Sequence, residues 1–398
     1  MAVIKKILAF NTGSSSIKFS MYEIGEAERL VFTGSLSRLG SSGTMFFVRD
    51  AQGNSLVSES VGAQHHDAAS EYVFSWIASQ GIGFKPDAVG HRIVHGGPLY
   101  SIPQCVTPEL IASLETMTPY APEHLPQAIN AVKYIAKRFP ETLQITCFDT
   151  LFHSTMPPIA KLYALPESIR REGVRRYGFH GLSYEYILLE LKRQQGLQVL
   201  QKRMIFAHLG HGASMVAVKN GKSIETTMGF SPAGGLMMST RTGDLDPGVI
   251  LFLLQQDKMT PAAIKEMVNR RSGLLGVSGI TDDMRELLDA ENSDDRAGEA
   301  VALFCYQARK YIGALSAVLG GLDTLVFTGG IGEHSPEIRS RICTDLEFLG
   351  VRIDEEKNRT NSFLISQDNS HVDIRIMSTN EELMIVRHTM SILKKLKR

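Results

Sequence analysis

Cysteine and tryptophan are scarce in this chain of 398 residues, which contains four cysteines and one tryptophan. The cysteines stand far apart, at positions 105, 147, 305 and 343. They form no Cys-x-x-Cys pair, and no histidine stands near them at the spacing of a zinc finger. This pattern is typical of reduced thiols in the cytosol, so we expect a cytoplasmic protein.

Long apolar runs and an excess of one charge are absent as well. No stretch approaches the roughly 18 apolar residues of a membrane helix, and the start, Met-Ala-Val-Ile-Lys-Lys, has no signal-peptide core. Lys plus Arg and Asp plus Glu both total 42, for a formal net charge of zero. This balance argues against nucleic acid or a membrane surface as the main partner. The length and composition predict a soluble globular protein of roughly two or three domains.

A strand, a Gly/Ser-rich turn and a second strand open the chain. Residues 7–10 and 17–21 are apolar, and Asn-Thr-Gly-Ser-Ser-Ser lies between them. The same order returns half a chain later, where the apolar residues 204–207 and 215–218 flank His-Leu-Gly-His-Gly-Ala-Ser. Asn-Gly at 220–221 then predicts a tight hairpin. Two matching units of this kind indicate an internal duplication.

Helical patterns separate these units, and they occupy residues 68–80, 126–139, 184–194, 261–268, 298–319 and 380–397. Residues 324–327 read as a buried strand, and Ser335-Pro336-Glu337 reads as the start of a further helix. The order predicts an α/β protein of two domains that pack around one cleft. We expect an N-terminal domain at residues 1–150, completed by a C-terminal helix at 382–398, and a second domain at 151–381.

Three Gly/Ser-rich turns follow predicted strands, at residues 11–16, 208–214 and 329–333. Glycine lets the backbone approach a ligand closely, and the N–H groups of such turns bind anions. The chain has no Walker A motif, and Gly210-His211-Gly212 is no Rossmann turn because it lacks the third glycine and a strand follows it. The best match is a duplicated, actin-like architecture that holds the phosphates of a nucleotide.

Four charged or titratable residues stand in unusual settings beside apolar runs and glycines: Arg92, Asp149, His180 and Arg241. Each alone has a structural explanation, such as an ion pair or a cap. Together they supply what phosphoryl transfer needs, because the transferring group carries charge on its equatorial oxygens and arginine forks match that geometry.

These residues stand in segments that resemble the acetate and propionate kinases. The matching segments are Asn-Thr-Gly-Ser-Ser-Ser-Ile-Lys-Phe (11–19), His-Arg-Ile-Val-His-Gly-Gly (91–97), Phe-Asp-Thr-Leu-Phe-His (148–153), Arg-Arg-Tyr-Gly-Phe-His-Gly (175–181), Met-Gly-Phe-Ser-Pro (228–232), Thr-Arg-Thr-Gly-Asp-Leu-Asp-Pro (240–247), Phe-Thr-Gly-Gly-Ile-Gly-Glu (327–333) and Thr-Asn-Glu-Glu (379–382). The resemblance implies the fold of the acetate and sugar kinase, Hsp70 and actin superfamily, usually as a homodimer. It also implies transfer of the ATP γ-phosphoryl group to a short-chain carboxylate, which gives an acyl phosphate and ADP.

The resemblance further implies roles for particular residues. Asn11 and Glu381 would hold Mg²⁺, with Mn²⁺ as a substitute. Arg92 would bind the carboxylate beside Val94, Phe179 and Pro232, and Asp149, His180 and Arg241 would be catalytic. The nucleotide, ATP or ADP, would contact Ser14, Ser16, Lys18, His208, Leu209, Gly210, His211, Gly212, Asp283, Met284, Arg285, Gly329, Gly330, Ile331, Gly332 and Glu333. Since a carboxylate is already ionised at pH 7, Asp149 need not abstract a proton, and we expect it to orient Arg92 or a metal-bound water.

Two departures from the usual family sequence bear on specificity. The family's Gly-Asn-Gly is here Gly210-His211-Gly212, with a bulkier, titratable residue. Its Ala-Pro-Leu-His-Asn is here Ala-Pro-Glu-His-Leu, and Glu123, if it points inward, would disfavour the methyl group of acetate. Acetate is the first expectation, with propionate or another short-chain acid as the alternative. The rivals from other classes are a non-catalytic ATP-binding protein of the actin-like superfamily and a sugar kinase on the same fold.

Overall fold

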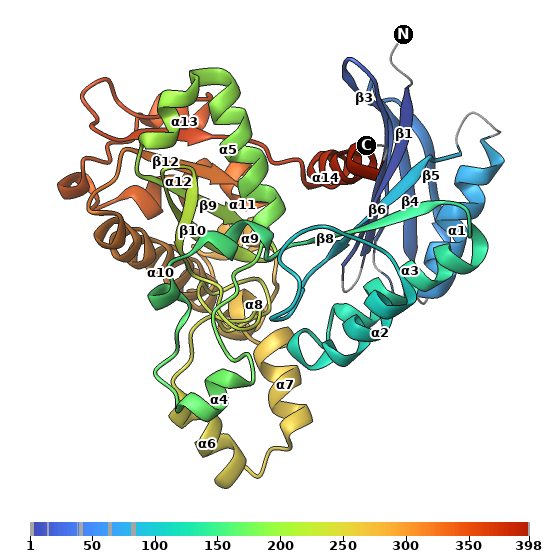
Figure 1. Ribbon diagram of the computed structural model, residues 1–398. Coiled ribbons are helices and arrows are strands. Elements are labelled where there is room, and N and C mark those ends of the chain that lie inside the picture. Colours follow the sequence, from blue (N-terminus) through green and yellow to red (C-terminus); the bar gives the residue numbers. More distant parts are fainter. Residues whose placement is uncertain are drawn as a thin grey trace. The chain divides into compact units, whose positions relative to one another are not determined.

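The structure of the protein is a computed structural model that describes residues 4–13, 16–37, 39, 43–62, 66–80 and 85–396. The chain divides into two compact units (Figure 1). The first unit combines Met1–Leu151 with Asn380–Arg398, and the second unit is Phe152–Thr379. Among the described residues, no helix is both long enough and apolar enough to cross a lipid bilayer.

The first unit is built on a sheet of eight strands in the order β5-β4-β3-β2-β1-β6-β8-β7. Its strands are Lys5–Thr12 (β1), Ser16–Ile24 (β2), Glu28–Ser37 (β3), Thr44–Asp50 (β4), Ser55–Val61 (β5), Ala88–Ile93 (β6), Gln104–Cys105 (β7) and Leu143–Phe148 (β8). Strand β1 pairs with β2 antiparallel and with β6 parallel. Both β1 and β8 are almost wholly buried, as expected for central strands covered on both faces.

Helices cover both faces of this sheet. The helices of the first unit are His66–Ser79 (α1), Pro108–Thr116 (α2), Leu125–Arg138 (α3) and Glu381–Leu396 (α14), with a 3₁₀ turn at Thr118–Tyr120. Helices α1 and α3 pack with Leu8, Phe10 and Val89 in one apolar core. Helix α14 contacts β1, β2, β6 and β8, and it lies on the opposite face, over Gly90 (Figure 1).

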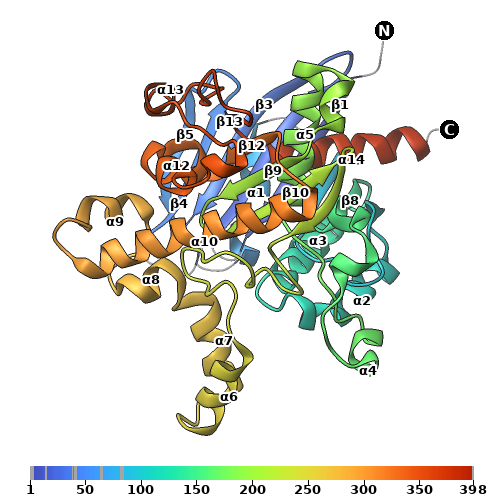
Figure 2. The ribbon, with the colours of Figure 1, turned by 90° about the vertical axis from the view of Figure 1, so that its left-hand side faces the viewer.

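The second unit holds a sheet of five strands in the order β11-β10-β9-β12-β13. The strands are Met204–Leu209 (β9), Ala213–Lys219 (β10), Lys222–Thr226 (β11), Thr324–Thr328 (β12) and Asp373–Ile376 (β13). Helix α5 (Gly181–Gln195) packs on one face with Phe206, Val216 and Val326. Helix α10 (Asp295–Leu319) crosses β9, β10 and β11, with α8 and α9 beside it (Figure 2).

The remaining helices of the second unit are short. They are Glu167–Arg171 (α4), Pro247–Gln255 (α6), Pro261–Arg270 (α7), Gly273–Ser278 (α8), Met284–Ala290 (α9), Gly329–His334 (α11), Pro336–Cys343 (α12) and Glu355–Arg359 (α13). Short 3₁₀ turns occur at Leu151–Thr155, Pro158–Lys161, Leu197–Gln201 and Glu347–Leu349.

The two sheets repeat the same five-strand pattern. The order β3-β2-β1-β6-β8 in the first unit corresponds to β11-β10-β9-β12-β13 in the second. In both, the first two pairings are antiparallel and the last two are parallel. The predicted internal duplication and the mixed α/β class are therefore confirmed.

Most predicted elements are present with small shifts at their ends. The predicted strands correspond to β1, β2, β9, β10 and β12, and the predicted helices to α1, α3, α5, α7, α10 and α14. One expectation was wrong. Residues 329–333, expected as a turn, begin the short helix α11, because the Glu333 carboxylate accepts hydrogen bonds from Gly329 N (2.9 Å) and Thr328 Oγ1 (3.3 Å) at its start.

Candidate active site

In the first unit, the end of the β1–β2 hairpin brings polar side chains next to β6. Asn11 on β1 faces Lys18 across the hairpin. Arg92 on β6 donates from Nη1 to Asn11 Oδ1 at 3.2 Å and from Nη2 to Asp149 Oδ2 at 2.6 Å. Asp149 follows β8 directly, and its N–H donates to Ile93 O at 2.9 Å. The ends of β1 and β8 thus hold the arginine of β6 from its two sides.

The Arg92–Asp149 ion pair is buried. The side chains expose 14% and 0% of their surface. Burial alone would lower the pKa of Arg92, but the charges of Asp149 and Glu381 raise it above its ordinary value, so the arginine stays cationic. Its Nε is buried and has no hydrogen-bond acceptor among the residues that the structure describes. The guanidinium is therefore fixed in place, and its Nε–H is still available to donate.

Glu381, the first residue of α14, lies in the same electrostatic environment. Burial and the negative charges of Asp149 and Glu382 raise its pKa to about 7, although Arg92 and Lys18 oppose the shift. A carboxylate with a raised pKa gains when a cation approaches. In the described part of the chain, no three His, Cys, Asp or Glu side chains form a metal-binding cluster. Mg²⁺, however, usually takes only one or two protein carboxylates and completes its shell with water and phosphate oxygens.

In the second unit, His180 precedes α5 with a left-handed backbone (φ 58°), which is unusual for a residue other than glycine. Its Nδ1 lies 2.8 Å from Ser214 Oγ, and its ring stacks on His208 with centroids 4.2 Å apart. His208 Nδ1 in turn lies 2.9 Å from Ser183 Oγ. Both imidazoles are thereby oriented, and Nε2 of His180 faces Gly212.

Arg241 reaches the same glycine from another loop. A Cβ atom placed on Gly212 would lie 3.3 Å from His180 Nε2 and 3.6 Å from Arg241 Nη2. Arg241 also donates from Nη1 to Pro232 O at 2.8 Å. The structure therefore brings together four residues predicted from the sequence, His180, Gly212, Pro232 and Arg241, within one unit.

A cavity of about 700 Å³ lies beside this group in the second unit. Of the predicted nucleotide contacts, it is lined by Gly210, His211, Asp283, Met284, Arg285, Gly330 and Ile331. Lining residues that the sequence did not suggest are Ser239, Asp282, Leu288, Asp289, His334, Ser335, Pro336 and Glu337. The size and glycine-rich walls suit a nucleotide. The Ser-Pro-Glu segment, which the sequence predicts as a helix start, begins α12 and contributes part of the wall.

An imidazole–carboxylate contact lies at the edge of the cavity wall. His211 Nε2 lies 3.2 Å from Asp282 Oδ2. Burial of the imidazole among protein atoms and the positive charge of Arg241 lower the pKa of His211. The charge of Asp282 opposes this shift, but the pKa remains below its ordinary value. His211 is thus mainly neutral at pH 7.

The other predicted site residues are not on the cavity wall. Leu209, Gly329, Gly332 and Phe179 are buried, and the Glu333 carboxylate is occupied at the start of α11. Val94 is also buried, Ser16 and His208 are half-buried, and Lys18 is exposed. Ser14 lies outside the described residues.

The fold and the site define an ATP-dependent phosphotransferase of the actin-like fold. The defining features are two sheets with one repeated topology, a glycine-lined cavity, and a histidine and an arginine beside that cavity. The chain belongs to the acetokinase family, whose sequence profile matches residues 6–387. Enzymes of this family transfer phosphoryl groups from ATP to a carboxyl group, and this chain is one of them.

Proteins that match the chain over nearly its whole length include acetate and propionate kinases. The chain is 46% identical over 389 residues to an acetate kinase of Rhodopseudomonas palustris (strain TIE-1), covering 96% of this chain and 97% of that protein. It is 39% identical to the acetate kinase of Porphyromonas gingivalis in its crystal structure, with a TM-score of 0.85 and coverage of 98% and 100%. A propionate kinase from Francisella tularensis is 33% identical, with a TM-score of 0.89 and coverage of 96% and 98%.

Proposed function

We propose that this enzyme transfers the γ-phosphoryl group of ATP reversibly to acetate, giving acetyl phosphate and ADP. The observation that carries the proposal is the meeting of His180 Nε2 and Arg241 Nη2 at Gly212, in the loop that also lines the cavity through Gly210 and His211. Two donors beside a phosphate-binding loop can stabilise the charge on the equatorial oxygens of a phosphoryl group in transfer. His180 and Arg241 are accordingly our candidate catalytic residues in the second unit.

Arg92 is the proposed binder of the acceptor carboxylate. Its guanidinium is buried and cationic, and its Nε has no acceptor among the described residues. Acetate is ionised at pH 7, so the reaction needs no base to create the nucleophile. Asp149, at 2.6 Å from Arg92 Nη2, serves instead to hold the guanidinium in its orientation. We propose that Val94, Phe179 and Pro232 contact the short apolar tail of the acid.

Asn11 and Glu381 are the proposed holders of Mg²⁺, or of Mn²⁺ in its place. Asn11 and Glu381 offer oxygen ligands, which Mg²⁺ prefers, and the raised pKa of Glu381 would be relieved by a divalent cation. When bound, the metal would neutralise charge on the phosphate oxygens. Asn11 would then serve two partners, because its Oδ1 also accepts from Arg92.

ATP and ADP are proposed to occupy the cavity of the second unit. Gly210, His211, Asp283, Met284, Arg285, Gly330 and Ile331 would contact the nucleotide directly. The glycines of the β9–β10 loop and of α11 suit the phosphates because they let backbone N–H groups approach closely. Leu209, Gly329, Gly332 and Glu333 would then support this wall from behind.

We further propose a cytoplasmic homodimer in which the two compact units are the two domains. Helix α6, Pro247–Gln255, has no buried side chain, and Val249, Leu251 and Phe252 expose 40%, 54% and 56% of their surface. An exposed apolar helix of this kind is typical of a subunit interface. The four free cysteines fit a reducing compartment.

A substrate panel tests the proposed function. Formate, acetate, propionate, butyrate and hydroxy acids are each supplied with ATP and Mg²⁺. ADP release is followed, and a hydroxamate trap detects the acyl phosphate. We expect the highest kcat/KM with acetate, while a preference for propionate would favour the activity named for the Francisella relative. No acyl phosphate with any acid, despite tight ATP binding, would overturn the proposal in favour of a non-catalytic ATP-binding protein.

A further inference from the structure

Arg241 stands in a long segment that lacks regular secondary structure. This segment, residues 227–246, joins β11 to α6 and is called the arginine loop below. Precise placement matters here, because a misplacement of about 1 Å can cost roughly 100-fold in rate. The arginine loop must therefore be held by contacts from outside it.

Asp244 closes the arginine loop on itself. Its Oδ1 accepts from Gly235 N at 2.8 Å, and its own N–H donates to Gly235 O at 2.9 Å. The two residues form the neck of a smaller loop that contains Arg241. Gly235 (φ 88°) and Gly243 (φ 73°) make the close approach possible, since a Cβ on Gly243 would lie 2.5 Å from Gly235 O.

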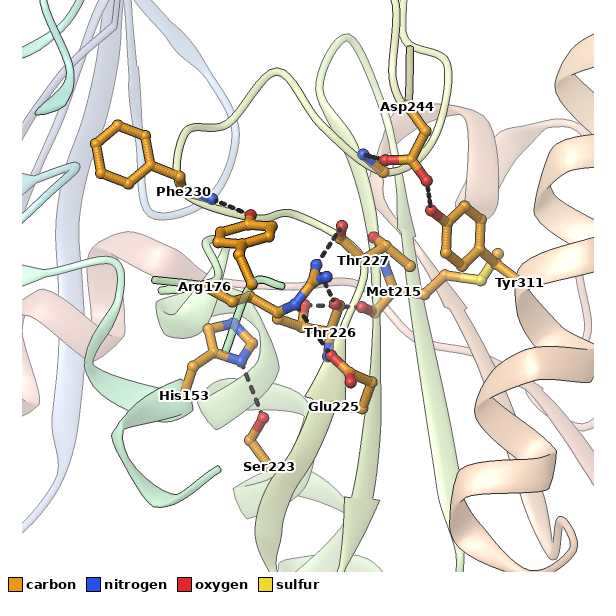
Figure 3. A network of polar contacts seen from close by, with 12 residues as sticks. His153, Arg176, Met215, Ser223, Glu225, Thr226, Thr227, Phe230, Asp244 and Tyr311 are labelled. Atoms are coloured by element: carbon orange, nitrogen blue, oxygen red, sulfur yellow. Dashed lines mark hydrogen bonds and ion pairs between the residues drawn. The ribbon is translucent and has the colours of Figure 1, made fainter. Parts of the chain in front are cut away.

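Helix α10 anchors this neck from outside. Tyr311 Oη donates to Asp244 Oδ2, and Figure 3 shows the two side chains meeting between the loop and the helix. One helical turn earlier, Gln307 Oε1 accepts from Met237 N at 2.8 Å. Burial and the Asp244 charge raise the pKa of Tyr311, so its hydroxyl remains a donor throughout the physiological range.

The other end of the arginine loop is held separately. Arg176 Nη1 donates to the carbonyl oxygens of Thr226 and Thr227, both at 3.2 Å (Figure 3). Tyr163 Oη accepts from Phe230 N at 2.8 Å. These contacts fix where the segment leaves β11. The residues next to Arg241 are also tied to α7 and α8, because Thr242 N donates to Val268 O at 3.1 Å and Thr240 O accepts from Ser272 N at 3.0 Å. The neck at Gly235 and Asp244, anchored by α10, closes the base of the same smaller loop.

We propose that Asp244 is a positioning residue that sets the place of Arg241 through the Gly235 neck and Tyr311. The proposal rests on the proposed function, in which Arg241 acts on the transferring phosphoryl group. Asp244 is exposed and is not among the residues that line the cavity, so it acts through the loop rather than on a substrate. Its loss should misplace Arg241 without unfolding the protein.

The test compares Asp244→Ala with a matched control two residues away. Asp246→Ala removes an exposed carboxylate of the same segment, which caps α6 by accepting from Gly248 N at 2.6 Å. We expect Asp244→Ala to lower kcat about 10- to 100-fold with KM for acetate nearly unchanged, and Asp246→Ala to leave kcat within about twofold. Tyr311→Phe, which removes one hydrogen bond, should lower kcat about three- to tenfold.

A second background separates positioning from general damage. In Arg241→Lys, where the fork geometry is already lost, Asp244→Ala should lower kcat by less than about threefold. An effect as large as in the wild-type background would overturn the proposal, as would an unchanged kcat in Asp244→Ala and Tyr311→Phe. Amide hydrogen exchange gives a readout independent of activity, and it should be faster across residues 235–244 in Asp244→Ala but not in Asp246→Ala. A wild-type protein that makes no acyl phosphate would refute the proposed function. Unchanged amide hydrogen exchange across residues 235–244 in Asp244→Ala would instead refute the role of the neck in holding the loop.

Discussion

Replacement of Asp149 by Asn tests the buried ion pair of the first unit. The substitution keeps the shape of the side chain and one oxygen for Arg92 Nη2, but it removes the negative charge. Because Asp149 is fully buried and Arg92 is 14% exposed, water cannot replace that charge. Removal of one partner of a buried pair typically costs about 3 to 5 kcal/mol.

Two features of the structure reduce the expected cost. The retained oxygen still accepts a hydrogen bond, and Glu381 and Glu382 still place negative charge near Arg92. We therefore expect Asp149→Asn to lower the free energy of unfolding by about 2 kcal/mol. The guanidinium should also lose its fixed orientation, so KM for acetate should rise about tenfold, which is equivalent to roughly 1.4 kcal/mol of binding.

Urea unfolding and an acetate titration with the hydroxamate assay measure the two effects. Asp87→Asn is the matched control, because Asp87 pairs with Lys5 in the same unit but exposes 33% of its side chain. A partly exposed pair of this kind should contribute less than about 1 kcal/mol. If Asp149→Asn and Asp87→Asn cost the same and KM stays at its wild-type value, the reasoning about Arg92 is refuted.

Three further predictions concern charge. Arg241→Ala should lower kcat at least about 100-fold, while Arg92→Ala should mainly raise KM for acetate; near-normal turnover in Arg241→Ala would remove its catalytic role. The pKa of Glu381 is raised to about 7. The contribution of this protonated carboxyl to the free energy of unfolding is therefore fully present below pH 4.5 and is lost as the pH rises through 7. Glu381→Gln should therefore raise the unfolding midpoint in chelator at pH 8 but not at pH 4, and equal midpoints at pH 8 would contradict this. The pKa of His211 is lowered, so its imidazole becomes cationic only as the solution becomes acidic. As the pH falls from about 7.5, KM for ATP in wild type should therefore decrease relative to KM in His211→Asn, and parallel KM–pH profiles would contradict this.

Local sequence patterns predicted the elements that local forces determine. Asn220 and Gly221 have φ of 53° and 68°, as a two-residue hairpin turn requires, and they join β10 to β11 as expected. Helix α10 follows from its regular apolar spacing, and the start of α12 from Pro336. Helix α6 was not predicted, because its sequence is almost wholly apolar and shows no helical period.

The arrangement of the site depends on contacts between distant residues. The sequence indicated Arg92 and Asp149 individually, but only the parallel pairing of β6 with β8 brings them to 2.6 Å. The role of Tyr311 had no sequence signal, since it lies 67 positions from Asp244 on a helix with many candidate neighbours. Likewise, the wall formed by Asp282 and Leu288 depends on how α9 packs on α10.

The placement of α14 has a consequence for synthesis of the protein on the ribosome. The first unit is made early, yet one face of its sheet is covered by a helix that follows the whole of Phe152–Thr379. Gly90 fits that helix so closely that a Cβ would lie 2.3 Å from Thr389 Oγ1 and 2.5 Å from Ile385 Cγ2. Until α14 emerges, the apolar side chains of Ile7 and Ala9 and the backbone at Gly90 have no helix over them. The nascent first unit should therefore depend on chaperones or slow translation for longer than its position in the chain suggests.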